Sequence, residues 1–250
     1  MPHFDHGAVS IYFEQSGEGY PLLLLAPGAM NSVVEFWANA TINPLAHYRD
    51  GFRMVAMDQR NAGRSSGPLD LSDPWGSYAE DQLALLEHLG IDRFHVMGCC
   101  IGASFALKLI AVAPSRVTAA VLEQPIGIAD GNSLLYEQMW RGWGDELAVR
   151  RPEVTRRRIA RFGTRMWEPN DFVVSVSREF VQDCTTPLLV LPGTDRYHPT
   201  ATGREIATLS PAARLVEPWN DSEEHVEETI EVVREFLERH VPGEAAPSAQ

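Results

Sequence analysis

The chain has 250 residues, 44% of them hydrophobic, and a formal net charge of -13. This composition is typical of one globular domain with a sizeable core and excludes a disordered chain. The acidic charge disfavours nucleic acid and anionic membranes as partners, and no apolar run approaches the ~20 residues that span a bilayer. The first residues lack a basic region followed by an apolar stretch, so no secretory signal is expected. Three cysteines (99, 100 and 184) are too few for a disulfide framework, which favours a reducing, cytoplasmic compartment.

The first half of the chain alternates between strand and helix patterns. The expected strands are 8–15, 22–26, 52–57, 93–97 and 117–123. The expected helices are about 33–48, 75–89 and 102–113. This alternation predicts the α/β class, with a mostly parallel sheet and helices on both faces.

The alternation then breaks. The segment 128–185 carries only helical patterns, over 134–143, 152–167 and 171–183. The order resumes with a strand at 187–192, a helix near 202–208, a strand at 213–217 and a helix at 226–240. We therefore expect a core of residues 1–127 and 186–241, a small helical cap insertion of residues 128–185 over the carboxyl edge of the sheet, and a flexible tail of residues 242–250.

The most informative motif is a G-x-C-x-G pentapeptide, Gly98-Cys99-Cys100-Ile101-Gly102, between a strand pattern and a helix pattern. A residue on such a sharp turn adopts a strained backbone conformation, and side chains at the two glycine positions would clash. The motif thus places Cys100 on a sharp turn at the start of a helix, as a candidate nucleophile.

Three markers together resemble the α/β-hydrolases of the esterase, C–C hydrolase and haloperoxidase type, over roughly residues 20–240. They are a Pro27-Gly28 turn after the second strand, the stretch Asp58-x-Arg60-x-x-Gly63-x-Ser65, and the G-x-C-x-G turn at Cys100. This turn resembles the nucleophile elbow of the family and is called the elbow below. The departure from the family pattern is Cys100, where most members carry serine. Dienelactone hydrolases are similar in having a cysteine nucleophile, although the other motifs resemble the capped esterase branch.

The resemblance implies a catalytic triad in the chain order nucleophile, acid, histidine. Cys100 takes the first position, Asp195 lies on the loop implied for the acid, and His225 opens the last helix, where the base is implied. Glu123 is an alternative acid, and His198, three residues after Asp195, is a rival for His225 that is expected to line the pocket or pack. The alternatives for Cys100 are an inert buried thiol and a cysteine introduced in place of serine.

The family pattern also implies an oxyanion hole made by the backbone N–H groups of Ile101 and Ala29. Asp58 and Arg60 are expected to tie their loop together by charge-assisted hydrogen bonds. Cys99 and Cys184 have no motif around them and are expected to pack.

The cap insertion is expected to roof an apolar cavity. The candidate substrate-binding residues are Met30, Met139, Trp140, Trp143, Phe162 and His198. The alternative is that the cap tryptophans attach cap to core. Seven arginines between residues 150 and 165 indicate either a solvated helix face or a docking patch for an anionic partner.

These features predict a cofactor-independent hydrolase that forms a thioester on Cys100 and acts on a small or medium ester, lactone, thioester or activated C–C substrate. No metal-ligand spacing, dinucleotide motif or P-loop is present, so neither a metal nor a cofactor is implied. The alternatives are an acyltransferase or cyclase with the same triad, and a non-catalytic binding protein. The expected partner is a small molecule, and a homodimer stays open.

Overall fold

The computed structural model describes residues 2–129, 131–168 and 172–243. In these residues eight strands form one sheet in the order β1-β2-β4-β3-β5-β6-β7-β8. The strands are β1 (His3–His6), β2 (Val9–Ser16), β3 (Tyr20–Leu25), β4 (Phe52–Met57), β5 (Phe94–Cys99), β6 (Val117–Glu123), β7 (Leu188–Leu191) and β8 (Ala213–Leu215). Only the pairs β1–β2 and β2–β4 are antiparallel and the other five described pairs are parallel, so the sheet is mostly parallel, as predicted.

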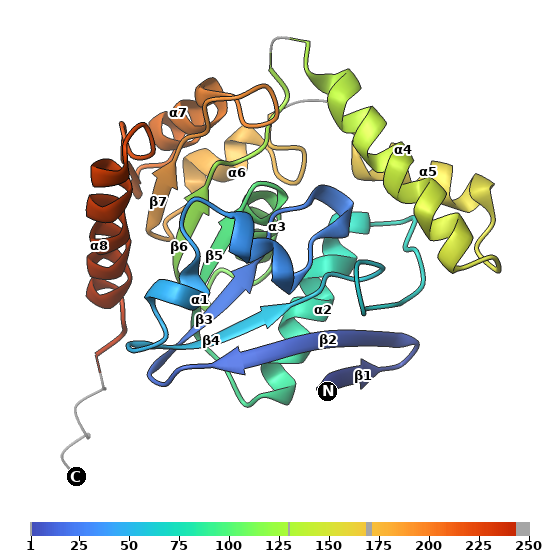
Figure 1. Ribbon diagram of the computed structural model, residues 1–250, viewed down its shortest axis with the longest axis horizontal. Helices are drawn as coiled ribbons and strands as arrows, with labels where there is room; N and C mark the ends of the chain where they lie inside the picture. Colours follow the sequence, from blue (N-terminus) through green and yellow to red (C-terminus); the bar gives the residue numbers. More distant parts are fainter. Residues whose placement is uncertain (1, 130, 169–171, 244–250) are drawn as a thin grey trace.

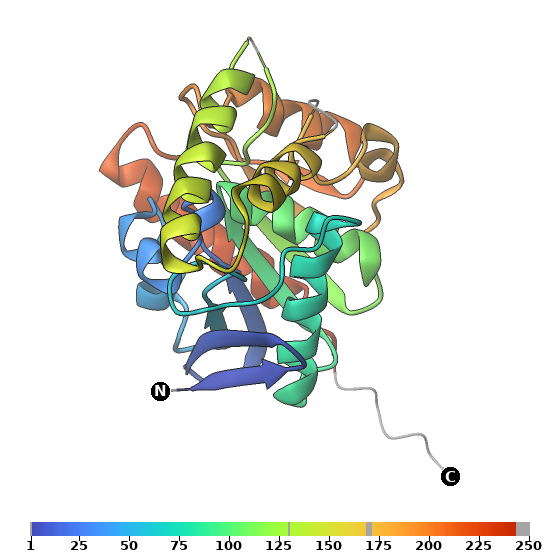
Figure 2. The ribbon, with the colours of Figure 1, turned by 90° about the vertical axis from the view of Figure 1, so that its right-hand side faces the viewer.

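The described helices lie on both faces of this sheet (Figures 1 and 2). Helices α2 (Pro74–His88) and α3 (Ile101–Val112) pack together on one face. Helices α1 (Pro44–His47) and α8 (Glu223–Arg239) lie together on the other, where Arg234 donates to the carbonyl of His47. Helix α7 (Thr200–Leu209) packs against β7 and β8. The sheet and the helices on both of its faces confirm the predicted α/β class.

The central strands are buried because helices cover both of their faces. The side chains of Leu22 to Leu25 in β3 and of Leu188 to Leu191 in β7 are fully buried. A parallel strand covered on both faces has no solvent side, so its sequence reads as a continuous apolar run and not as an alternation. Because β3, β5, β6 and β7 run parallel, their carboxyl ends lie at one edge of the sheet.

Most of the predicted elements are confirmed, with bounds for β4 and β6 that equal the predicted 52–57 and 117–123. Residues 3–6, for which no element is predicted, form strand β1. One expectation is wrong: the single helix expected over about 33–48 is replaced by two 3₁₀ turns, η1 (Ala29–Asn31) and η2 (Val34–Asn39), and the short α1.

Between β6 and β7 the described residues contain three helices, here called the cap helices: α4 (Ser133–Arg150), α5 (Arg156–Met166) and α6 (Arg178–Asp183). The helix expected over 171–183 starts at a residue outside the described ones, and its described part is helical only from Arg178. Figure 1 shows α4 and α5 projecting from the carboxyl edge of the sheet. The cap boundaries at 128 and 185 stay a prediction, and the predicted tail lies, from residue 244 on, outside the described residues.

The arginine run attaches the cap helices to the core. Four of its members donate to backbone carbonyls of the loop between β4 and α2. The pairs are Arg150 with Asn61, Arg151 with Gly67, Arg158 with Leu69, and Arg165 with Leu71 and Ser72. Four of the seven side chains therefore bind acceptors within the chain, so the run is not merely a solvated helix face, and the docking patch for an anionic partner stays a prediction.

Within the described ranges, no helix combines the length and the hydrophobicity that a membrane crossing requires.

Candidate active site

The elbow at the end of β5 places Cys100 in a backbone conformation that side chains rarely adopt. Its φ is 59° and its ψ is −120°. Both flanking glycines are required by sterics. A Cβ at Gly98 would lie 2.1 Å from the carbonyl oxygen of Gly102, and one at Gly102 would lie 1.9 Å from that of Leu25. Helix α3 starts at the next residue, Ile101, so the positive end of its dipole lies at the thiol.

A histidine and a carboxylate from the β7–α7 loop complete the group around Cys100. His198 Nδ1 lies 2.9 Å from Asp195 Oδ2, and the N–H groups of Tyr197 and His198 donate to Asp195 Oδ1 over 2.7 and 2.9 Å. Because Nδ1 is held by the carboxylate, the buried Nε2 is the ring atom left for the thiol, with which His198 interacts. The described residues thus bring together a thiol, an imidazole and a carboxylate, the three chemical groups that a nucleophile–base–acid triad requires.

The electrostatics of this group favour a thiolate–imidazolium pair. Burial raises the pKa of the Cys100 thiol, but the interaction with the neighbouring His198 imidazolium outweighs it, helped by two backbone N–H groups, so the thiol pKa lies below its ordinary value. Burial lowers the pKa of His198, but the interactions with Cys100 and then with Asp195 outweigh it and raise this pKa to about 9. Asp195 keeps a lowered pKa because its hydrogen bond to His198 outweighs burial.

The structure does not bring the predicted base to the cysteine. His225 Nδ1 lies 2.5 Å from Asp221 Oδ1 at the exposed start of α8, and no contact joins it to Asp195 or Cys100 among the described residues. Asp195 instead pairs with His198, the residue that the sequence offered only as a rival. The spacing Asp195-x-x-His198 was the available signal, since a histidine three residues along a tight loop can fold back on the same carboxylate.

Two backbone N–H groups face the Cys100 sulfur, those of Ile101 and Gly28. Ile101 is one of the two predicted oxyanion donors and Gly28 precedes the other, Ala29, whose part in an oxyanion hole stays a prediction. Gly28 has a φ of 115°, and a Cβ there would lie 2.2 Å from the Phe36 ring, so this turn needs glycine. The arrangement is able to stabilise a negative oxygen beside the sulfur.

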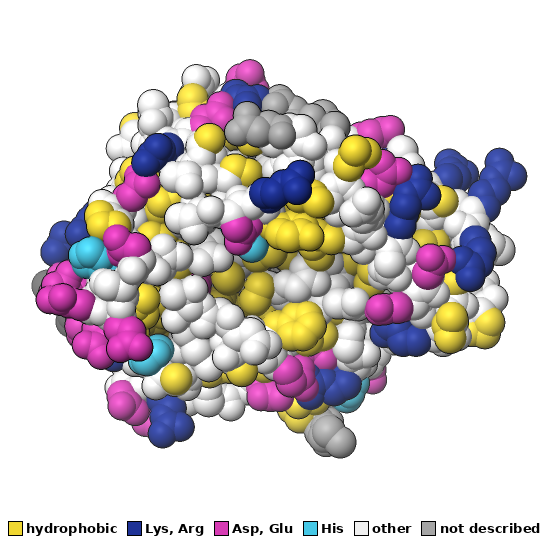
Figure 3. Space-filling model, turned by 45° about the horizontal axis from the view of Figure 1, so that its top comes forward, with side chains coloured by type: hydrophobic (Ala, Val, Ile, Leu, Met, Phe, Trp, Pro, Cys, Tyr) yellow, Lys and Arg dark blue, Asp and Glu magenta, His cyan; other side chains and the backbone are white. Residues whose placement is uncertain are grey.

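A hollow of about 340 Å³ opens at the cysteine, and most of its wall comes from the segment between β3 and α1. Its lining residues are Pro27, Gly28, Phe36, Asn39, Ala40, Thr41, Cys99, Cys100, Gln124 and His198. Figure 3 shows hydrophobic side chains gathered in a depression at the centre of this face of the molecule. Of the predicted substrate-binding residues, only His198 is among those that line the hollow.

The other five predicted residues lie elsewhere, mostly within the cap. The Trp143 ring packs against Phe162 at 5.8 Å between centroids, and the Trp143 indole donates to the carbonyl of Asn61. Trp140 covers Gly163, where a Cβ would meet its ring at 2.2 Å. Met30 is buried in η1, and Met139 packs partly buried against the core. These contacts support attachment of cap to core and not an aromatic pocket at the cysteine.

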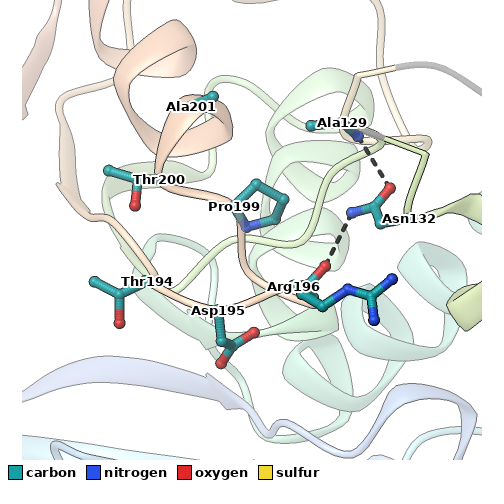
Figure 4. A pocket seen from close by; sticks show the side chains of 8 residues that line it. All are labelled: Ala129, Asn132, Thr194, Asp195, Arg196, Pro199, Thr200 and Ala201. Carbon is teal, nitrogen blue, oxygen red and sulfur yellow. Dashed lines mark hydrogen bonds between the residues drawn. The ribbon is translucent and has the colours of Figure 1, made fainter.

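A second, more polar hollow of about 400 Å³ lies between the acid loop and the start of the cap segment (Figure 4). Its lining residues are Ala129, Asn132, Thr194, Asp195, Arg196, Pro199, Thr200 and Ala201. Sequence reasoning missed both this hollow and its contact with the start of α4.

The remaining candidates behave as structural groups. Asp58 accepts from the N–H of Val34 and from Arg64, and Arg60 forms a double hydrogen bond with buried Asp81, which confirms the expectation that both tie loops together. Burial raises the pKa of Cys99 well above its ordinary value, and it raises that of Glu123 to about 8. The side chain of Glu123 accepts from the N–H of Ile42, and its carboxylate makes no hydrogen bond to a histidine among the described residues.

Among the described residues, no group of three or more histidine, cysteine or acidic side chains could hold a metal ion.

The family model of the alpha/beta hydrolase fold matches residues 21–169, more than half of the chain. The chain therefore belongs to the α/β-hydrolase fold family. It is similar to RutD of Azorhizobium caulinodans, a carbamate hydrolase by name, with 30% identity over 134 residues, which are 52% of this chain and 47% of that protein. It is also similar to the N-formylmaleamate deformylase of Pseudomonas putida, with 31% identity over 114 residues, 46% of this chain and 40% of that protein. The chain spans less than half the length of each of these curated relatives.

Two solved structures share the fold over nearly the whole chain. A meta-cleavage product hydrolase from Pseudomonas fluorescens has a TM-score of 0.68 at 20% identity, covering 92% of this chain and 95% of that one. The enol-lactonase from Burkholderia xenovorans has a TM-score of 0.67 at 20% identity, covering 95% of this chain and 100% of that one. At these identities the likeness establishes the fold and leaves the chemistry to the site.

Proposed function

We propose that the protein is a cofactor-independent hydrolase that acts through a Cys100–His198–Asp195 triad on a small or medium ester, lactone, thioester or activated C–C substrate. The observation that carries the proposal is the group at the elbow: a buried thiol of lowered pKa, coupled to a histidine that a carboxylate orients. Structural cysteines buried in apolar surroundings have a raised thiol pKa, as Cys99 and Cys184 do.

In this reaction the Cys100 thiolate attacks the substrate carbonyl carbon, and the carbonyl electron pair moves onto oxygen. The N–H groups of Ile101 and Gly28 stabilise that oxyanion. When it collapses, the bond to the leaving group breaks, and the His198 imidazolium gives its proton to that group, leaving a thioester on Cys100. His198, now neutral, takes a proton from water, the resulting hydroxide attacks the thioester, and the Cys100 thiolate and the imidazolium are restored with release of the acid.

The hollow at Cys100 favours a compact substrate. Its volume of about 340 Å³ is at the lower end of ligand pockets, and its wall is mainly apolar with polar groups from Thr41 and Gln124 at one side. The named relatives act, by their names, on carbamate, formylated amide, enol-lactone and meta-cleavage products. We infer a small acyl compound as the substrate class. Because a thiolate nucleophile has to stay reduced, we also propose a cytoplasmic site of action.

The test is intact-mass analysis after exposure to a panel of p-nitrophenyl esters and lactones of graded chain length. We expect the mass of one acyl group on the protein, mapped by peptide digestion to Cys100, and its decay as free acid forms. Cys100→Ala should abolish both, and Cys184→Ala, the matched change at another buried thiol, should leave both intact. An adduct that persists in water but transfers to an added amine or thiol would make the protein an acyltransferase. Absence of any adduct on Cys100 would contradict the proposal.

A further inference from the structure

The first turn of the cap helix α4 contacts the loop that carries the acid and the base. The Tyr136 hydroxyl donates to the carbonyl of Tyr197 over 2.5 Å, and the Asn132 amide donates to the carbonyl of Arg196 over 3.1 Å. Arg196 and Tyr197 are the two residues between Asp195 and His198. Both carbonyls of the short connection between acid and base are thus held by side chains from a different element, as Figure 4 shows for Arg196.

Asn132 and Tyr136 are themselves fixed. Asn132 is buried, accepts from the N–H of Ala129 and donates to the carbonyl of Gly127. Tyr136 is 2% exposed, and its ring stacks on Trp167 with 5.2 Å between centroids and 13° between planes. A rigid donor loses little entropy on binding its acceptor, so these two side chains define where the carbonyls lie.

The Tyr136 hydroxyl is close enough to Cys100 and Asp195 for their charges to affect its pKa. Burial contributes most to raising the pKa of Tyr136, and the negative charges of Cys100 and Asp195 raise it further. The hydroxyl therefore stays protonated and remains a donor throughout the range in which the thiolate forms.

We propose that Tyr136 and Asn132 are positioning residues that hold the Asp195–His198 loop so that His198 faces Cys100. The proposal rests on the function proposed above. It assigns the start of the cap a role in building the catalytic group, in place of the roof that the sequence predicts. A displacement of the loop by a fraction of an ångström would lengthen the contact between His198 and the sulfur while leaving the substrate hollow, which contains neither Tyr136 nor Asn132, unchanged.

The test variant is Tyr136→Phe, which removes one hydroxyl and keeps the stack on Trp167. We expect kcat to fall about tenfold with little change in KM, and the pH at which iodoacetamide begins to label Cys100 to rise. Asn132→Ala should act in the same direction. The matched control is Tyr20→Phe, whose hydroxyl bonds Thr118 at the opposite end of the sheet and whose labelling profile should equal that of the wild type.

A second readout does not depend on catalysis. The proton between His198 Nδ1 and Asp195 should give a downfield NMR resonance, identified by its loss in His198→Ala. We expect it to broaden or vanish in Tyr136→Phe and to persist in Tyr20→Phe. An unchanged resonance and labelling profile in a folded Tyr136→Phe protein would overturn the positioning role. If the wild-type thiol shows no lowered pKa, the proposed function fails, and the resonance alone still decides the role of Tyr136.

Discussion

Two aspartate–histidine pairs in this molecule look alike in sequence and differ in what they can do. Asp195 and His198 are three residues apart, Asp221 and His225 four, and in both pairs Nδ1 of the ring binds the carboxylate. The His198 side chain is 16% exposed, the His225 side chain 38%. His198 has a buried Nε2 and a thiol beside it, whereas His225 lies on an exposed helix start. The aspartate contact is therefore shared by both histidines, and the thiol beside the second ring nitrogen of His198 is what supports the proposal that His198 is the base.

The order of strands explains why the first pair reaches the thiol. Cys100 follows β5, and in the sheet β7 is two strands from β5 while β8 is three. With about 4.8 Å between neighbouring strands, the β7 loop starts about 10 Å from the elbow and the β8 loop about 14 Å. The β7 loop also turns back at Gly193, where a Cβ would lie 2.2 Å from that of His198. The shorter distance and the tight turn bring His198 to the sulfur.

The largest expected effect comes from replacing each histidine by alanine in turn, which tests directly which of the two serves the thiol. His198→Ala should lower kcat/KM on an activated ester by on the order of 10³–10⁴-fold, because it removes both the base and the cation that stabilises the thiolate. His225→Ala should leave kcat/KM unchanged. Steady-state kinetics on the two purified variants, each checked for folding by circular dichroism, makes the measurement. A large loss in His225→Ala with little in His198→Ala would return the base to α8.

A smaller effect is expected for the carboxylates. Asp195→Asn should reduce kcat by on the order of 10²-fold, because the amide cannot hold His198 in the tautomer that presents Nε2 to the thiol, although the half-exposed carboxylate leaves water able to substitute in part. Asp221→Asn should not change kcat. Rates near the wild-type value in Asp195→Asn would leave a Cys100–His198 dyad or move the acid to Glu123.

The pH dependence of turnover distinguishes the two pairs, because only the group around His198 is expected to set the limbs of the profile. On each limb the rate is expected to change by about tenfold per pH unit. The lowered pKa of Cys100 means that the thiolate is lost as the pH falls through that value, so turnover decreases on the acid side. The raised pKa of His198 means that the imidazolium is lost as the pH rises through about 9, so leaving-group protonation and turnover decrease on the alkaline side. A bell with its alkaline limb near pH 9, unchanged by His225→Gln, is expected from initial rates. An alkaline limb that moves with His225→Gln would contradict this assignment.

The sequence predicts the parts of the site that depend on local backbone constraints. Gly98 and Gly102 have no space for a Cβ, as a sharp turn requires. The apolar runs of β4 and β6 are typical of buried strands, and both strands are buried. The choice between His198 and His225 depends on how a loop folds back, which no periodicity records. The hollow was misplaced for a similar reason, since the segment expected as one helix over about 33–48 breaks into short turns that form part of its wall.

The cap contacts were also beyond the sequence. A run of arginines does not show which acceptors it will meet, and here these are backbone carbonyls of a loop about 90 positions away along the chain, as for Arg158 and Leu69. Tyr136 and Asn132 carry no motif, and their partners become visible only when the start of α4 is placed against the β7 loop.

The smallest expected effect tests whether the second pair, Asp221 and His225, serves only helix α8. Ser222 caps helix α8, its hydroxyl accepting from the N–H of His225 over 3.1 Å. Ser222→Ala should lower the free energy of unfolding by about 1 kcal/mol, the usual cost of removing a helix N-cap, because an N–H at the helix start loses its partner. The same variant should keep wild-type kcat and KM, since the residues around His225 serve the helix and not the thiol. Urea unfolding and ester kinetics on one preparation give both numbers. Loss of activity at unchanged stability would mean that the start of α8 contributes to the site after all.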